Sequence, residues 1–70
     1  MIPANAVVDV LDPPPVPGGL GRYRVEVWGK EPYDYARVYE ISAVDANMAA
    51  VEGLQRFSDE ITALIENKDS

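Results

Sequence analysis

An apolar pattern with the period of an α-helix runs through residues 46–67, ANMAAVEGLQRFSDEITALIEN. Its members are spaced 4, 3, 4 and 3 residues apart, which places them on one side of a helix. They are Ala50, Leu54, Phe57, Ile61 and Leu64. Val51 and Ile65 widen this apolar stripe, and Asp45, alone or with Ser42, can cap the first turn. The pattern therefore predicts one long helix that packs on the rest of the chain through this stripe.

Two runs with the alternation of β-strands precede the helix, at residues 22–28 and 36–43. Their apolar faces consist of Tyr23, Val25, Val27, Tyr39, Ile41 and Ala43. The connection, which contains Gly29 and Pro32, is too short for a parallel crossover, so the two runs should pair antiparallel. The sequence thus predicts a single small α+β domain over residues 22–70, in which an antiparallel β-hairpin packs against one long C-terminal helix.

Residues 1–21 are rich in Pro and Gly and form a predicted leader or arm. Residues 13–17, PPPVP, should be extended polyproline-II chain. Residues 6–11, AVVDVL, are β-branched enough for a third, N-terminal edge strand, with a docked arm or a disordered tail as alternatives. The prolines either bind an aromatic groove, clasp a neighbouring subunit, or serve only as a spacer.

Composition narrows the classes of function. The chain has 70 residues, 12 acidic against 6 basic, and it contains neither His nor Cys. Thiolate nucleophiles, His-based catalysis and imidazole or thiolate metal sites are therefore excluded. The net charge of −6 opposes direct nucleic-acid binding, which depends on Lys and Arg. We expect a protein that is not an enzyme and uses no metal or cofactor.

No stretch of the sequence approaches the roughly 18–20 apolar residues that a membrane helix needs. The N-terminal residues also lack the basic stretch and long apolar run of a signal peptide. The default expectation is therefore a cytoplasmic protein without a membrane partner.

Aromatic residues gather around the expected hairpin tip, and we call Trp28, Tyr33 and Tyr35 the aromatic loop. Alternation places Trp28 on the face away from the helix. Tyr and Trp are enriched at binding hot spots, because they combine large area with a polar group. The aromatic loop is therefore the first candidate surface for binding a partner protein. The alternative is that Trp28 packs under the leader or the loop as an internal plug.

Four carboxylates recur every seven residues on the helix side opposite the apolar stripe. This acidic row consists of Asp45, Glu52, Asp59 and Glu66. It can imitate nucleic-acid phosphates and bind a basic groove of a partner, and Glu52 and Asp59 are its candidate binding residues. The alternative is a solvated outer face, in which Glu52 and Arg56 form a supporting ion pair.

The same helix predicts a possible homodimer. Its stripe has heptad-like spacing, which can seat a second copy of the helix. A helix of about 22 residues spans roughly 33 Å, more than the roughly 20–24 Å of two short strands. One helix also leaves one face of a sheet uncovered. Gly53 beside the stripe indicates close approach of a strand or of a partner helix.

Residues 23–43, YRVEVWGKEPYDYARVYEISA, and 48–57, MAAVEGLQRF, resemble small uncharacterised bacteriophage proteins with the same strand–strand–helix pattern. The resemblance excludes the leader and transfers no site residue. It implies a phage-encoded accessory protein that binds and inhibits a host protein in the host cytoplasm. The alternative it leaves open is a structural component of the virion or its assembly, which uses the Pro-rich arm.

Overall fold

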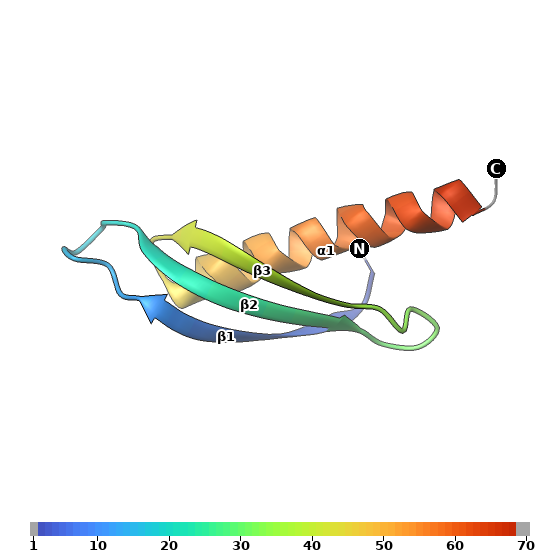
Figure 1. The fold of residues 1–70 in the computed structure, drawn as a ribbon, viewed down its shortest axis with the longest axis horizontal. Helices are drawn as coiled ribbons and strands as arrows, with labels where there is room; N and C mark the ends of the chain where they lie inside the picture. Colours follow the sequence, from blue (N-terminus) through green and yellow to red (C-terminus); the bar gives the residue numbers. More distant parts are fainter. Residues whose placement is uncertain (1, 69–70) are drawn as a thin grey trace.

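The computed structural model describes residues 2–68 as three strands followed by one helix (Figure 1). Strand β1 spans Ala4–Asp12, β2 Gly21–Gly29 and β3 Ala36–Ala43, and helix α1 spans Ala46–Lys68. The strands form one antiparallel sheet in the order β1-β2-β3, and α1 contacts all three strands. This arrangement confirms the predicted α+β class and includes the third, N-terminal edge strand.

Strand β1 lies within the segment that the sequence predicts as a leader. It pairs with β2 from Ala4, opposite Gly29, to Asp12, opposite Arg22, with a register shift between Val10 and Asp12. The prolines of residues 13–17 therefore lie in the β1–β2 connection, whose two ends are held in the sheet (Figure 1). The Pro-rich segment is a closed loop in this fold rather than a free arm.

The core lies between the sheet and α1. Its buried apolar residues are Tyr23, Val25, Val27, Ile41, Ala43, Ala49, Phe57 and Ile61. Those from β2 and β3 are the alternating positions that the sequence predicts for the buried face. Tyr39, the remaining member of that face, is half-buried because β3 is an edge strand.

The buried face of α1 is rotated relative to the predicted apolar stripe. Phe57 and Ile61 are fully buried, as expected, and Leu54 is half-buried. Leu64 and Val51 are 39% and 60% exposed, so their assignment to the packed stripe is wrong. Apart from Ala50, the predicted stripe follows large apolar residues, whereas the helix face nearest the sheet contains the small residues Ala49 and Gly53.

These small residues bring the first half of α1 close to the sheet. Ala49 is fully buried, and a Cβ atom built on Gly53 would lie 2.6 Å from Cγ1 of Val25. The close approach indicated by Gly53 is thus to strand β2. Larger side chains, Phe57 and Ile61, fill the space under the second half. The helix consequently diverges from the sheet toward its C-terminus (Figure 1).

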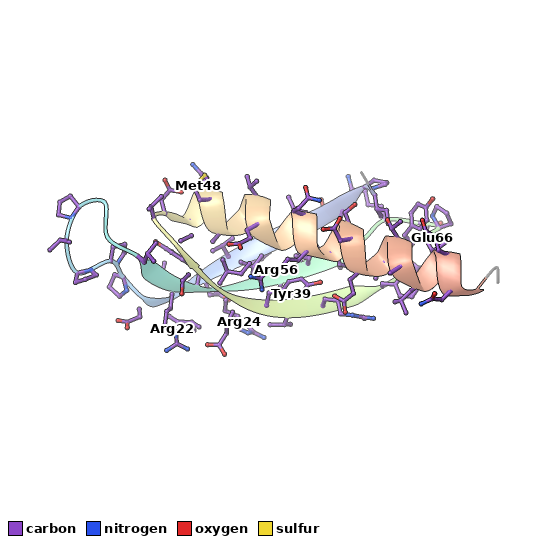
Figure 2. The ribbon with its side chains drawn as sticks, turned by 90° about the horizontal axis from the view of Figure 1, so that it is seen from above. Arg22, Arg24, Tyr39, Met48, Arg56 and Glu66 are labelled. Atoms are coloured by element: carbon purple, nitrogen blue, oxygen red, sulfur yellow. The ribbon has the colours of Figure 1, made fainter. Side chains whose placement is uncertain are left out.

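The opposite face of the sheet has no other described element packed on it, and we call it the open face. Ion pairs cross it between Arg22 and Glu40, at 2.5 Å, and between Arg24 and Asp9, at 3.6 Å. Both arginines extend away from α1 (Figure 2). The 23 residues of α1 span about 35 Å, and the 9 residues of β2 about 30 Å. The excess of helix over sheet is therefore smaller than the sequence predicts.

Candidate functional site

The structure separates the members of the aromatic loop. Trp28 lies on the open face, away from α1 as expected, is 37% exposed, and has Asn5 and Ala36 as its neighbours on β1 and β3. Tyr33 and Tyr35 are half-buried and pack against the core. The N–H of Tyr35 donates to the carbonyl of Tyr33 at 2.8 Å, which tightens the connection. Trp28 and the two tyrosines therefore do not form one continuous surface within a single chain.

The members of the acidic row have different roles. The carboxylate of Asp45 accepts a hydrogen bond from the N–H of Met48 at 2.8 Å and caps α1, as predicted. Glu52 forms an ion pair with Arg56 at 3.3 Å, also as predicted. Asp59 accepts a hydrogen bond from a side chain of the same helix. Glu52 and Asp59 thus remain available at the surface of α1, whereas Asp45 has a structural role.

A groove opens at the corner where β3 leads into α1. The chain turns there through Val44 and Asp45, and Leu20 reaches the same corner because Gly21 pairs with Ala43. This corner groove has a volume of about 460 Å³. It is lined by Leu20, Ser42, Ala43, Val44, Met48, Val51, Glu52 and Gln55.

Four large apolar side chains around the corner groove are exposed to solvent. Leu20 is 64% exposed, Val44 45%, Met48 52% and Val51 60%. Single exposed apolar residues are ordinary, but contiguous ones mark interaction sites. The carboxylate of Glu52 lies beside them. The groove can therefore receive apolar side chains of a partner and place a basic group next to a carboxylate.

Sequence reasoning identified Glu52 as a candidate but missed the groove around it. Met48 and Val51, three residues apart on one side of α1, are the signal that indicates the groove, but the predicted stripe assigns Val51 to the core instead. Leu20 carries no such signal, because the pairing of β2 with β3 alone brings it to the corner.

A polar cluster links β3 to the flank of α1. The hydroxyl of Tyr39 donates to Oε2 of Glu60 at 2.5 Å, and Nε of Arg37 donates to Oε1 at 3.1 Å. Arg56 lies on the same flank and interacts with Tyr39 electrostatically (Figure 2). The cluster therefore fixes which part of α1 lies beside the edge of the sheet.

The ionisation of the cluster indicates a structural role. Burial, and then the hydrogen bond and charge of Glu60, raise the pKa of Tyr39 from 10.0 to about 12. The hydrogen bond from Tyr39 is the largest of the effects that together lower the pKa of Glu60. Near neutral pH the phenol keeps its proton and the carboxylate its charge, so neither group is poised for acid–base catalysis.

Among residues 2–68, no group of three or more acidic side chains is placed to hold a metal ion. No helix in this described part of the chain is long and apolar enough to cross a membrane. The chain matches no protein-family model, and comparisons with curated proteins and with solved structures give no match.

Proposed function

We propose that this protein is a non-catalytic protein-binding module that engages its partner through the corner groove. The observation that supports the proposal is the group of exposed apolar side chains around the groove, with Glu52 beside them. Their burial supplies affinity in proportion to the apolar area removed from water. The partner contributes apolar side chains to the groove and a Lys or Arg next to the carboxylate.

Charge favours a partner with a basic surface. The net charge is −6, and the four arginines of the chain all form ion pairs with its own carboxylates. Asp59 and Glu66 are both exposed on α1. Asp59 lies near the groove, since it accepts a hydrogen bond from Gln55 of the groove lining, and Glu66 lies further along the helix. This distribution attracts a basic partner during encounter, while the apolar contacts determine how long it stays bound.

The resemblance to small bacteriophage proteins supports a specific form of this function, in which the module inhibits a host protein by occupying one of its surfaces. The alternative form, a virion or assembly component, depends on a Pro-rich arm that reaches a neighbour. Residues 13–17 lie instead in the closed β1–β2 connection, so the groove is the better supported contact surface.

Affinity capture from a bacterial lysate tests the proposal with matched variants. Met48→Lys and Val51→Lys place a charge in the groove, and Leu64→Lys places the same charge on an exposed apolar position of α1 outside it. We expect the groove variants to weaken capture by about tenfold or more, equivalent to about 1.4 kcal/mol, and the control to retain it. Equal capture by all three variants, each shown to be folded by circular dichroism, would exclude the groove.

Salt distinguishes the corner groove from the acidic row as the main binding surface. Exposed charges are screened beyond about 8 Å at physiological ionic strength, so binding through the row should fall steeply as salt rises. Binding through apolar area should change little. If Glu52→Lys and Asp59→Lys abolish binding while Val51→Lys leaves it intact, the acidic row is the binding surface.

A further inference from the structure

The two edges of the sheet differ in how they are protected from pairing with another strand. Strand β1 follows Pro3, precedes Pro13 and has an irregular register between Val10 and Asp12. Prolines and bulges are the devices by which natural edge strands avoid further pairing. Strand β3 pairs with β2 over 8 residues without a register shift and contains no proline. The edge of β3 is therefore the one suited to accept a strand.

The ladder shows which backbone groups of β3 point outward. The N–H of Gly29 donates to the carbonyl of Tyr35 at 2.9 Å, next to the pair formed by Trp28 and Ala36. Hydrogen-bonded and non-hydrogen-bonded pairs alternate along an antiparallel ladder. Odd-numbered residues of β3 consequently bond to β2, and even-numbered residues direct their N–H and C=O groups away from it. The outward set is Ala36, Val38, Glu40 and Ser42.

We propose that β3 pairs antiparallel with β3 of a second copy of this chain, about a two-fold axis at Tyr39. Val38 then lies opposite Glu40 of the second copy, and Ala36 opposite Ser42. These are the residues with outward backbone groups, so Val38 and Glu40 exchange hydrogen bonds across the interface. The C=O of Ala36 accepts a hydrogen bond from Nη1 of Arg37 at 2.8 Å within its own chain and uses its second lone pair for Ser42 of the second copy. The product is a six-stranded sheet with both helices on one face.

The charges on the flank of α1 select this register. Glu60 accepts hydrogen bonds from both Arg37 and Tyr39, so it lies level with Val38, the residue between them along β3. Arg56 is one helical turn nearer the start of α1, about 6 Å along its axis, or about two residues along the strand. It is therefore level with Glu40. The two-fold rotation about Tyr39 places the level of Glu40 in one copy opposite the level of Val38 in the other. It therefore brings Arg56 of one copy opposite Glu60 of the second copy.

The neighbouring register is electrostatically unfavourable. An axis at Glu40 would place Glu40 against Glu40 and Arg56 against Arg56, and like charges directly opposite each other destabilise a sheet.

The distance between the two helices also suits the proposed dimer. Each helix lies over three strands spaced about 4.8 Å apart, so the two helices would lie about 14 Å from each other. This separation is too wide for direct helix packing, at about 8–10 Å, and leaves room for Arg–Glu pairs.

The same register brings together residues that one chain keeps apart. Ala43 lies opposite Tyr35 of the second copy, one residue beyond the paired strand. Tyr35 of each copy is thereby placed at the rim of the other copy's corner groove, near Glu52. Tyr35 of one copy and Glu52 of the other then belong to one composite surface, and the dimer has two such surfaces.

Single-cysteine variants test the register, because the chain has no Cys of its own. Tyr39→Cys places two thiols opposite each other across the axis, whereas the neighbouring Glu40→Cys does not. Under mild oxidation we expect Tyr39→Cys to form covalent dimers about tenfold faster than Glu40→Cys, since bridging requires Cα atoms within about 7 Å. The reverse order would overturn the register, and the absence of dimers in both variants would overturn the pairing.

Proline variants test the edge with the protein alone, independently of any partner at the groove. Val38→Pro removes an outward N–H of β3 without breaking the ladder to β2, and Val10→Pro does the same on β1. In sedimentation, we expect the wild type to approach twice its 7.7 kDa as concentration rises. Val38→Pro should raise the dimer dissociation constant by about tenfold, and Val10→Pro should leave it unchanged.

Trp28 fluorescence distinguishes the edge from the open face. Pairing through β3 leaves Trp28 uncovered, so its emission should not shift as the dimer forms. A blue shift on association would indicate that two open faces pack together and would overturn the edge pairing, as would a single 7.7 kDa species at all concentrations.

Discussion

Replacement of Gly53 by Ala should destabilise the protein although the glycine lies inside a helix. At an unobstructed helical position the change stabilises by about 1 kcal/mol, because Ala has the higher helix propensity. Here the new carbon would lie 2.6 Å from Cγ1 and 3.1 Å from Cβ of Val25. Carbon atoms in good contact are about 3.5–4.0 Å apart, so either α1 or β2 must move.

Neither element can move easily. Val25 is fully buried in the central strand, and its branched side chain has few alternative rotamers. Overpacking of this kind costs about 1–3 kcal/mol, and the gain in helix propensity offsets about 1 kcal/mol. A net loss of about 1 kcal/mol corresponds to a fall in Tm of about 4–8 °C for a domain of this size.

Urea unfolding followed by circular dichroism measures the effect, with a double-mutant cycle to isolate its cause. Val25→Ala removes the obstructing atom, so Gly53→Ala should cost less in that background than in the wild type. Ala63→Gly, at an exposed position of α1, is the propensity control and should destabilise by about 1 kcal/mol. A higher Tm for Gly53→Ala would refute the close approach of α1 to β2.

Three further changes test the core, the helix cap and the polar cluster. Phe57→Ala should cost about 3–5 kcal/mol, comparable with the stability of so small a domain, and an unchanged thermal melt would contradict the packing of α1. Asp45→Ala should cost about 1 kcal/mol in urea unfolding, whereas Asp45→Asn should retain most of the cap. The pKa of Tyr39 is raised from 10.0 to about 12, so its contribution is complete below pH 10 and is lost as pH rises toward 12. The pKa of Glu60 is lowered, so its contribution is lost as pH falls through the folded-state value. Tyr39→Phe should flatten the alkaline limb of a stability–pH profile and Glu60→Gln the acid limb.

The spacing of apolar residues along the chain is sufficient to predict most of the fold, because each strand and the helix bury one side. Alternation gave β3 its bounds, and the helical spacing gave α1 its first residue. The sequence predicts β1 only as one of three alternatives, because its short apolar run is flanked by prolines and depends on β2 for its pairing. The rotation of α1 was missed because Ala49 and Gly53 are too small to mark a buried face by hydrophobicity.

The candidate site was less predictable, because it depends on contacts between distant parts of the chain. Tyr33 and Tyr35 are close to Trp28 in sequence, yet the connection folds onto the core and leaves Trp28 on the open face. Leu20 and Met48 are far apart in sequence, and strand pairing brings them to one groove. Sequence proximity therefore grouped residues that the fold separates and overlooked residues that it joins.

The height of α1 above the sheet links stability to binding at the corner groove. Ala49 and Gly53 hold the first half of the helix close to β2, and Met48 and Val51 lie on the same turns. A methyl group at Gly53 must lift these turns and change the shape of the groove.

Gly53→Ala should therefore weaken partner binding as well as stability. Phe57→Leu, which loosens the second half of α1, should reduce stability while leaving the groove intact. Binding by titration calorimetry, at a temperature where both variants remain folded, separates the two effects, and wild-type affinity for Gly53→Ala would show that the groove does not depend on helix height.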